Sequence, residues 1–439
     1  MKALKYISLF VTILWLCLAC VDKRETASIS FHMPAEYEKQ AAVWLGWVDY
    51  PPYEQPFLDI AHALYPKVPL KMIAHSEESM KTLKDTLTYL GLDTSNISFQ
   101  LLADNRLWMR DHGATYLVNG QGEKKVVDFN WNMYGMPGFL EDLFEGDQDS
   151  IDFHMAERQS EAGIIDSLMG AREGYASVNT DVIMEGGSIE VNGKGTLILC
   201  EEVTFQRNPG KSRKYLESEF KRVLGVSNII WMKQGLVEDP LHFAEIIDGY
   251  YGYGTLGHTD EFVRFTNDST ILLAWVAEDE RELHPINEMN YQRMSANLAI
   301  LEAAHDQDGK PFTVIKVPLP DLMYQETSVA KDFASINWEE RAEWKVPAGW
   351  IPKQGVLTPG QPIKWVAAAS YLNYLVSNGV ILLPTYVAEG GASQEKEDQV
   401  KAIFSELFPN RELIFLDVIN LNYHGGGIHC VTQQEPASP

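Results

Sequence analysis

Hydrophobic and polar positions follow a recurring order along this chain. Four stretches begin on a polar residue, continue as a short strand pattern and end at a turn containing asparagine; they span residues 111–120, 185–193, 260–268 and 373–379. Asparagine followed by glycine between apolar runs predicts a tight hairpin, because the turn residues must tolerate positive φ. Each hairpin is therefore expected to begin beside a polar side chain.

The hairpins are followed by further apolar patterns that together suggest a repeating unit. Returning strands are expected at 196–199, 270–276 and 380–384, helices at 212–224, 286–304 and 395–407, and closing strands at 228–232 and 412–416. The unit is roughly β-β-α-β, and repeats of a unit that cannot close a core alone must pack around a common axis. The first polar residues of the units would then converge on that axis.

The composition, with 45% hydrophobic and 22% charged residues, is that of an ordinary globular protein. No Pro-, Ser- or Gly-rich linker divides the 439 residues, so we expect a single catalytic domain over residues 21–439. The formal net charge of −25 argues against a nucleic-acid partner, because phosphate contacts require basic side chains. The same charge favours a small cationic ligand. The sequence leaves the oligomeric state open and allows a homo-oligomer.

Residues 1–20 have the pattern of a signal peptide. Lys2 and Lys5 provide a basic start, and the apolar run that follows is too short for a comfortable transmembrane helix. Leu18-Ala19-Cys20 resembles a bacterial lipoprotein cleavage site, in which Cys20 would bear the lipid. We therefore expect export to the cell envelope, periplasmic or on the outer surface, with membrane contact only through this anchor. Secretion without a lipid is the alternative.

The candidate nucleophile is Cys430, which follows His429 in a glycine-rich stretch beginning at Gly425. Carboxylates and an imidazole stand far upstream, in the stretches 108–111, 184–187 and 257–260. A thiol, a histidine and several carboxylates suit covalent attack on a cationic carbon. A guanidinium provides such a carbon, and two carboxylates can clamp its N–H groups with charge-assisted hydrogen bonds.

These residues divide into the roles that hydrolysis of a guanidinium requires. Asp111 and Asp260 would clamp the substrate, and Cys430 as thiolate would attack the central carbon. His258 would protonate the departing ammonia and then deprotonate the water that hydrolyses the covalent intermediate. Glu185 would orient that imidazole and favour its charged form. We expect neither a cofactor nor a metal.

Structural roles are the alternatives for the same side chains. Asp111 could form an ion pair with its neighbour Arg110, and Glu185 could be a turn residue. His258 could be a core histidine, and Cys430 could be a small buried hydrophobic residue. The combination is more specific than any one of them.

Other kinds of site are disfavoured by their context. The stretch 252–257 matches the dinucleotide fingerprint, but a hairpin pattern follows it where a helix is required, so we interpret it as a loop. A zinc site from His424, His429 and Cys430 lacks the usual ligand spacing. Cys200 lies in an apolar strand pattern and is expected to be an inert core thiol, although pairing with Cys430 stays open in an oxidising compartment.

The chain resembles the agmatine deiminase and bacterial peptidylarginine deiminase family of the guanidine-modifying pentein superfamily. The matching motifs lie at 108–111, 128–132, 185–189, 257–265, 370–374 and 425–434. The resemblance implies a five-bladed, pseudo-symmetric α/β propeller of ββαβ units. It implies the same catalytic roles as those assigned above, with Asn373 as a supporting active-site amide and Trp108 among the substrate-binding residues.

Agmatine is the favoured substrate, converted to N-carbamoylputrescine and ammonia on the way to putrescine in polyamine metabolism. The secreted peptidylarginine deiminase has arginines after its D-F-x-x-N segment to hold a peptide carboxylate, and here residues 133–138 supply none. In contrast to agmatine deiminases, Ile428 directly follows the glycines and Glu190 replaces a histidine. Conversion of peptidyl-arginine to citrulline is therefore the alternative, followed by a non-catalytic guanidinium-binding lipoprotein and an amidinotransferase. The acidic segment 140–172 is expected to be a solvated loop near the site entrance.

Overall fold

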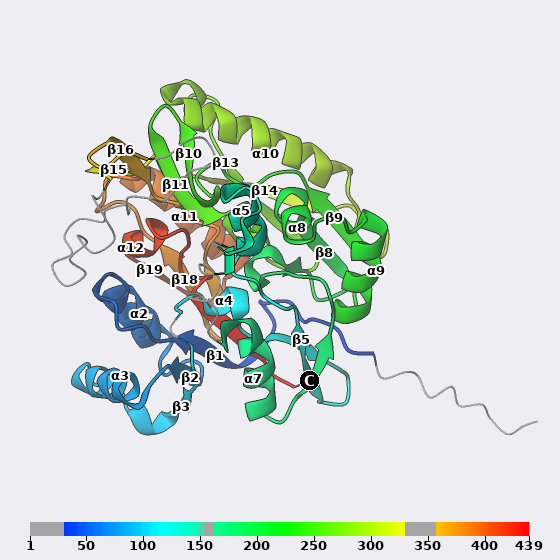
Figure 1. Ribbon diagram of the computed structural model, residues 1–439. Coiled ribbons are helices and arrows are strands. Elements are labelled where there is room, and N and C mark those ends of the chain that lie inside the picture. Colours follow the sequence, from blue (N-terminus) through cyan, green and yellow to red (C-terminus); the bar gives the residue numbers. More distant parts are fainter. Residues whose placement is uncertain (1–29, 105, 150, 153–160, 330–356, 439) are drawn as a thin grey trace, which may run out of the picture.

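The computed structural model describes residues 30–104, 106–149, 151–152, 161–329 and 357–438 (Figure 1). The predicted signal peptide, with Cys20, lies outside these residues. The described chain has a mixed α/β fold built from six small sheets. None of its described helices combines the length and the apolar character needed to cross a membrane.

Five of the six sheets share one strand order. In each of them the first strand pairs antiparallel with the second, and the second pairs parallel with the third. They are β4 (Thr115–Val118), β5 (Lys124–Asp128), β6 (Ala176–Asn179); β7 (Glu190–Val191), β8 (Thr196–Cys200), β9 (Asn228–Met232); β12 (Val263–Phe265), β13 (Thr270–Trp275), β14 (Thr313–Pro318); β17 (Leu375–Ser377), β18 (Val380–Pro384), β19 (Glu412–Leu416); and β20 (Thr432–Pro436), β1 (Gln40–Gly46), β2 (Leu70–Ala74), β3 (Ile97–Leu101).

Helices connect the parallel strands of these sheets, as the β-β-α-β pattern predicted. They are α2 (Pro51–Leu64), α3 (Glu77–Tyr89), α5 (Met136–Leu143), α7 (Ile165–Arg172), α8 (Glu201–Arg207), α9 (Arg213–Leu224), α10 (Pro285–Ala303) and α11 (Gln394–Leu407). Serines cap both of the helices predicted at 212–224 and 395–407: the side chain of Ser212 accepts a hydrogen bond from Tyr215 N, and that of Ser393 accepts one from Lys396 N. These starts lie within one residue of the predicted ones.

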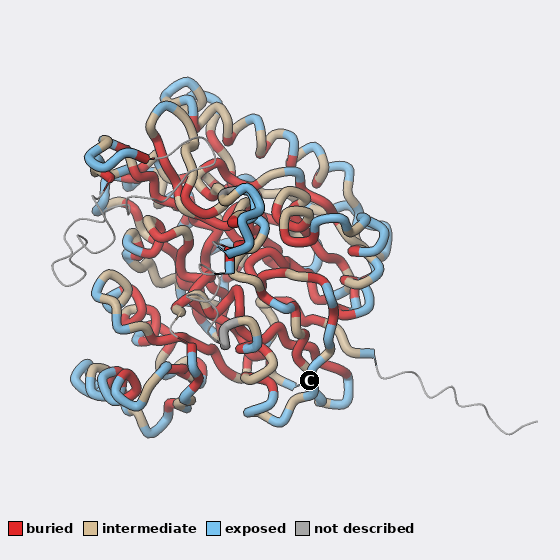
Figure 2. The backbone as a smooth tube through the Cα atoms, in the orientation of Figure 1, coloured by how far each residue is buried: buried red, intermediate tan, exposed pale blue. Residues whose placement is uncertain are grey.

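The inner strands form the core. Every residue of β8 and β18 is buried, and exposed residues gather on the outer helices (Figure 2). In the largest apolar cluster, Ile198, Phe262, Leu272 and Leu383 bring together residues from three of the sheets. Packing between neighbouring sheets therefore fixes where the hairpins begin.

The hairpin turns are as predicted, but their asparagines act mainly through their side chains. Positive φ falls on Gly193 and Gly379, at 67° and 72°. Asn192 Oδ1 instead accepts hydrogen bonds from Lys194 N at 3.0 Å and Thr196 N at 2.9 Å. Such side-chain-to-backbone bonds stabilise a tight turn without a left-handed asparagine.

A single helical turn precedes the first strand in three of the four predicted hairpins. These turns are α4 (Met109–His112), η3 (Gly186–Ser188) and η4 (Thr259–Glu261). The sequence pattern predicted strands directly after the polar residues and missed the helical turns, which are too short for a helical period to show. They matter because the polar side chains lie on or beside them.

The sixth sheet has the order β10 (Leu241–Ile247), β11 (Tyr250–Thr255), β16 (Pro362–Val366), β15 (Tyr324–Ser328). It corrects the interpretation of 252–257 as a loop, because most of that stretch is strand β11. A Cβ atom at Gly254 would come 2.1 Å from Asp239 Oδ1. This glycine thus permits a close approach between two chain segments. A strand here does not fit the dinucleotide fingerprint, which requires a helix after the glycines.

The prediction of a solvated loop at 140–172 is wrong at both ends. Residues 140–143 complete α5, and Leu140 is buried there. Residues 165–172 form α7, in which Ile165 and Met169 are fully buried against an apolar cluster that includes Val126. Two apolar residues one turn apart are enough to dock a short helix, even in an acidic segment. Gly170 allows that docking, since a Cβ there would lie 2.5 Å from a Val126 methyl group.

Candidate active site

Three of the predicted site residues precede the first strands of two different sheets and lie around one glycine. A Cβ atom at Gly187 would lie 2.6 Å from His258 Nδ1, 2.8 Å from Asp111 Oδ1 and 3.0 Å from Asp260 Oδ2. The three side chains belong to the helical turns α4 and η4 and the residue before η4. The convergence expected of the first polar residues of the hairpins is therefore present.

Cys430 lies two residues before β20 and is 3% exposed. Its Sγ atom is 3.0 Å from Asn373 Nδ2, 3.6 Å from Asp260 Oδ2 and 3.8 Å from Glu261 Oε1. Burial raises the pKa of the Cys430 thiol well above its ordinary value, and the neighbouring carboxylates raise it further. The thiol is consequently neutral.

His258 is held by its backbone and lies between two carboxylates. Its backbone N–H donates to Asp239 Oδ2 at 3.0 Å. Its ring nitrogen Nε2 is 3.4 Å from Glu185 Oε2, and Nδ1 is 3.4 Å from Asp111 Oδ1. Burial alone would lower the pKa of His258, but the charges of Asp111, Glu185 and Asp260 outweigh it and raise the pKa to about 9. The ring is an imidazolium at neutral pH.

Glu185 is completely buried and is kept ionised by an arginine that the sequence analysis missed. Arg207 Nε, on α8, donates to Glu185 Oε1 at 2.8 Å. Burial would raise the pKa of Glu185, but Arg207 and His258 lower it to about 2. Glu185 therefore has one oxygen for the arginine and one for the histidine, which matches an orienting role rather than that of a turn residue.

Asp111 is bound by a tyrosine from a strained loop. Tyr134 OH donates to Asp111 Oδ2 at 2.9 Å, and Gly187 N donates to Asp111 Oδ1 at 3.2 Å. Met133 and Tyr134 both have positive φ, at 62° and 61°, a conformation that side chains of this kind seldom adopt. Burial raises the pKa of Asp111 to about 6. The predicted alternative, an ion pair between Arg110 and Asp111, is replaced by one between Arg110 Nη2 and Glu36 Oε2, which are 3.7 Å apart.

Asp260 is hydrogen-bonded to His429. His429 Nδ1 is 2.7 Å from Asp260 Oδ2, and its Nε2 is 2.5 Å from Glu36 Oε2. Burial would raise the pKa of Asp260, but the hydrogen bond from His429 holds it below its ordinary value. Arg264 also contacts Glu36, at 2.8 Å. This buried network keeps Asp260 ionised. It also fixes the position of His429, which directly precedes Cys430 in the sequence.

Asn373 joins the nucleophile to a second missed residue, Glu261. Asn373 Nδ2 donates to Glu261 Oε1 at 2.8 Å as well as to the thiol, while its Oδ1 accepts from His429 N at 2.9 Å. Burial raises the pKa of Glu261 well above its ordinary value, and Asp260 raises it further. Its position directly after Asp260 in the sequence was the signal that could have identified it.

The three glycines before Cys430 bring the backbone close to the site. A Cβ atom at Gly426 would lie 2.6 Å from the ring of Trp108 and 3.0 Å from Cys430 Sγ. A Cβ at Gly427 would lie 2.7 Å from Asn373 Oδ1. Trp108 is thus beside the nucleophile, where the sequence analysis expected a substrate-binding residue.

Two alternatives raised by the sequence are a zinc site that includes His424 and pairing of Cys200 with Cys430. His424 Nδ1 is 2.6 Å from Asn420 O and its Nε2 is 3.3 Å from Tyr50 OH, so it does not join a zinc site with Cys430. Cys200 and Cys430 are both free thiols, and Cys200 is fully buried in the core, as predicted.

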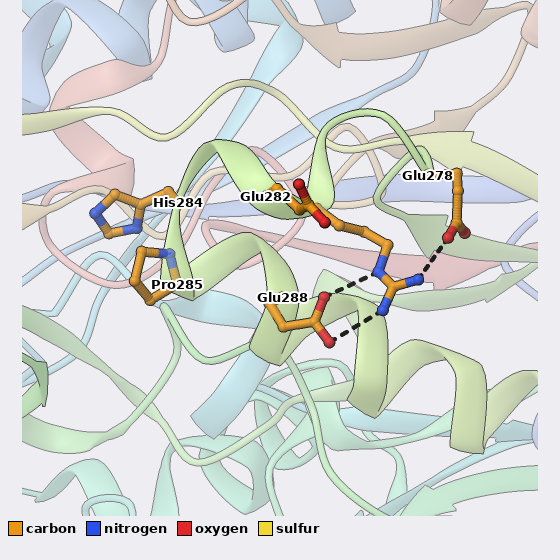
Figure 3. Close-up of a pocket in the computed structure, with 6 residues that line it drawn as sticks. Glu278, Glu282, His284, Pro285 and Glu288 are labelled. Carbon is orange, nitrogen blue, oxygen red and sulfur yellow. Dashed lines mark hydrogen bonds and ion pairs between the residues drawn. The ribbon is translucent and has the colours of Figure 1, made fainter.

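A surface hollow of about 440 Å³ lies near the start of α10 and contains none of the predicted residues (Figure 3). Arg281 there forms ion pairs with Glu278 and Glu288. Because these charges are paired with one another, the hollow offers no reactive group that compares with the buried cluster.

Comparison with known proteins agrees with this geometry. Residues 32–436 match the family described as Porphyromonas-type peptidyl-arginine deiminase, and the chain belongs to that family. The curated agmatine deiminase of Ectopseudomonas mendocina is 28% identical over 418 residues, covering 93% of this chain and 96% of that protein. The agmatine deiminase of Pseudomonas fluorescens is 29% identical over 420 residues with the same coverage.

The fold is also shared with a solved structure. The structure described as agmatine deiminase of Enterococcus faecalis catalyzing its reaction superposes with a TM-score of 0.69 at 22% identity, and the match covers 93% of this chain and 96% of that one.

Proposed function

We propose that this member of the Porphyromonas-type peptidyl-arginine deiminase family hydrolyses agmatine to N-carbamoylputrescine and ammonia, with Cys430 as the nucleophile. The observation on which the proposal rests is the buried cluster around Gly187, where a thiol, an imidazolium and several carboxylates meet. The names of the curated relatives, which match 93% of the chain, support agmatine as the substrate.

The guanidinium binds between Asp111 and Asp260. Both carboxylates accept its N–H groups, and the bidentate geometry places the central carbon near the thiol. Burial of the cluster makes these charge-assisted bonds strong, because water does not compete for them. The cation also offsets the carboxylate charge that raises the pKa of Cys430, so substrate binding favours the thiolate and the thiol proton passes to solvent.

In the first half-reaction, Cys430 Sγ attacks the guanidinium carbon and a C–S bond forms. One C–N bond then breaks as the His258 imidazolium donates its proton to the departing nitrogen. Ammonia leaves, and the alkyl thiouronium stays bound to Sγ. Glu185 keeps the imidazole in place during the transfer.

In the second half-reaction, neutral His258 removes a proton from water, which attacks the thiouronium carbon. The C–S bond then breaks, the hydroxyl proton of the tetrahedral adduct passes to solvent, the ureido product leaves, and Cys430 is again a thiolate next to an imidazolium. Cys430 and His258 thus return to the protonation states in which the first half-reaction began, without any redox step.

Deimination of peptidyl-arginine is the second candidate, and the description of the matching family supports it. The enclosure of the site favours agmatine, because Cys430 is 3% exposed and His258 1% exposed. Tyr134, bound to Asp111, also lies in the loop where a carboxylate-binding arginine would be needed. A small substrate with cations at both ends fits this acidic, enclosed position better than a polypeptide does.

The test is ureido-product formation by the purified protein with agmatine, free arginine and a peptide ending in arginine. Cys430→Ala is the control for the nucleophile, with its fold checked by circular dichroism. Preference for agmatine supports the proposal, and preference for the peptide moves the chain to the alternative. No product from any of the three, with variant and parent indistinguishable, rejects deimination.

We also propose that the five sheets of common strand order surround the site as the blades of a pseudo-symmetric propeller. Their identical pairing pattern and the convergence of their hairpin starts support this arrangement. An experimental structure in which the five sheets are unrelated by rotation about the site would contradict it.

For the first segment, we propose cleavage before Cys20, lipidation of that cysteine and export to the cell envelope. The basic start and the Leu18-Ala19-Cys20 sequence support this. Cys20→Ser is expected to move the protein from the membrane fraction to the soluble fraction. An unchanged distribution would count against the lipid anchor.

A further inference from the structure

Glu36 lies four residues before β1, and its carboxylate joins three distant parts of the chain. Its side chain is only 10% exposed. Oε1 accepts a hydrogen bond from Val376 N at 2.7 Å, and Oε2 accepts one from Arg264 Nη2 at 2.8 Å. Oε2 also lies 2.5 Å from His429 Nε2. These partners belong to β17, to β12 and to the stretch just before β20, so one carboxylate links three of the sheets.

The first connection from Glu36 to the nucleophile passes through His429. The second ring nitrogen of this histidine, Nδ1, is 2.7 Å from Asp260 Oδ2. The same carboxylate oxygen of Asp260 is 3.6 Å from Cys430 Sγ. Because His429 and Asp260 are both buried, water does not compete for these contacts. Glu36 therefore ends a continuous chain of hydrogen bonds that leads to the nucleophile.

The second connection passes through Arg264 and the backbone around Asn373. Arg264 Nη1 donates to Leu372 O at 3.0 Å and to Tyr374 O at 2.9 Å, the carbonyl groups on either side of Asn373. The Nδ2 atom of Asn373 is in turn 3.0 Å from the nucleophilic sulfur. Since the guanidinium is planar and rigid, the bond from its Nη2 to Glu36 sets the direction in which Nη1 points.

The contacts of His429 also determine how many protons its ring holds. Burial would raise the pKa of Glu36, but His429 and Arg264 hold it well below its ordinary value, and Asp260 is likewise ionised. Each ring nitrogen therefore faces a carboxylate oxygen and must donate, which requires two ring protons, whereas a neutral imidazole has one. Burial lowers the pKa of His429, as do Arg110 and Arg264, so the imidazolium depends on the two carboxylates.

We propose that Glu36 is a positioning residue of the deimination reaction. It holds His429 as an imidazolium that orients Asp260, and through Arg264 it fixes the backbone on both sides of Asn373. The inference rests on the proposed function, because Asp260 and Asn373 are the groups that would place the guanidinium and the nucleophile. Glu36 thus acts through other residues, from a segment far from the catalytic motifs in the sequence.

Glu36→Gln is the test variant, because it keeps the size of the side chain and changes its hydrogen bonding. Both oxygens of Glu36 accept hydrogen bonds, so the NH₂ group of glutamine would face a donor whichever way the amide is turned. Glu38→Gln is the matched control. Glu38 lies two residues further along the same segment, and its carboxylate pairs with Lys194 at 3.8 Å.

The first measurement is the protonation of His429, read from the nitrogen chemical shifts of the ring in protein with isotopically labelled histidine. The signals of His429 are identified by their absence from His429→Asn. Both ring nitrogens should have the shift of a protonated nitrogen in the parent and in Glu38→Gln, and only one of them in Glu36→Gln. A singly protonated ring in the parent, or a doubly protonated ring in Glu36→Gln, would overturn the proposal.

The second measurement is the binding of agmatine to protein with Cys430→Ala, in which turnover is absent, by isothermal titration calorimetry. Adding Glu36→Gln should weaken the affinity by about 10-fold, the size expected for loss of a charge-assisted hydrogen bond. In a His429→Asn background the same change should cost at most about 3-fold, because one of its two connections is already broken. Equal losses in the two backgrounds would overturn the proposal, since they would show that Glu36 does not act through His429.

The histidine spectrum of the parent protein guards against a variant that does not fold, because a singly protonated His429 there is enough to overturn the proposal. The spectrum also needs no turnover, so the two proposals can fail separately. The expected spectra without any ureido product from agmatine would reject the proposed function alone. Ureido product formation with the kcat/KM of the parent in folded Glu36→Gln would reject the positioning role alone.

Discussion

Replacing Gly187 by alanine tests the convergence of the site most directly. The φ angle of Gly187 lies outside the left-handed range, so alanine should be tolerated by the backbone itself. The added methyl group would occupy the space between His258, Asp111 and Asp260, at 2.6 Å, 2.8 Å and 3.0 Å from their nearest atoms. The substitution therefore perturbs geometry and leaves every reactive group in place.

The size of the effect follows from the shortest of these contacts. Carbon and nitrogen atoms in contact prefer a separation of about 3.5 Å, so His258 Nδ1 must retreat by about 0.9 Å from its position 2.6 Å from the new methyl group. The ring cannot swing away freely, because Glu185 and Asp239 hold its Nε2 and its backbone N–H. A displacement of about 1 Å in a catalytic group costs about 100-fold in rate, or about 2.7 kcal/mol of transition-state stabilisation.

The assay is kcat/KM for agmatine, measured as ureido product, together with the midpoint of thermal unfolding. Gly120→Ala is the control, since a Cβ there would have no atom within 4 Å. It should leave kcat/KM unchanged. If Gly187→Ala keeps the kcat/KM of the parent while folding normally, the three side chains do not act together around this point.

Three further predictions concern the pH dependence of catalysis, the hydrogen bond to Asp111 and a helix cap. The value of kcat/KM should rise with pH up to about 9 and then level off. The fraction of Cys430 present as thiolate grows with pH, but above about 9, the raised pKa of His258, the fraction of imidazolium falls and offsets that gain. A maximum near neutral pH would contradict this. Tyr134→Phe should lower kcat/KM by about 10-fold at neutral pH, since a hydrogen bond to a charged group is worth about 1.5–3 kcal/mol. The loss should shrink at higher pH, where Asp111 is ionised even without the hydrogen bond from Tyr134. Ser212→Ala should lower the free energy of unfolding by about 1 kcal/mol through loss of a helix cap, and a change in kcat/KM as well would contradict its purely structural role.

Much of the repeating unit could be predicted because its signals are local. The strand at Asn228–Met232 and the helix after Ser212 follow from side chains within a few residues of one another. Local patterns did not predict the single helical turns ahead of the hairpins. They also missed the short helix that Ile165 and Met169 dock within an acidic segment. Both are shorter than the window over which a helical period can be detected.

The site divides in the same way. Cys430, His258 and Asp260 were predicted from short motifs, because reactive residue types in glycine-rich turns are visible in the sequence. Their supporting partners were missed: Arg207 is 22 residues from Glu185, and Glu36 is 393 residues from His429. No local pattern encodes which distant charge will neutralise a buried carboxylate, since that depends on how the sheets pack.

Pairing of β1 with β20 has a consequence for how the enzyme comes into being. Residue Val43 lies opposite Gln434 in that antiparallel pair, and Trp44 Nε1 reaches Glu435 Oε2 across 391 positions of sequence. During synthesis β1 must wait until this partner, 391 positions later, emerges, and closing so long a loop is a slow step of folding. Cys430 lies two residues before β20 and is ordered by the same event. A nascent or truncated chain would therefore have no assembled nucleophile, and its reactivity would begin only when the final strand is in place.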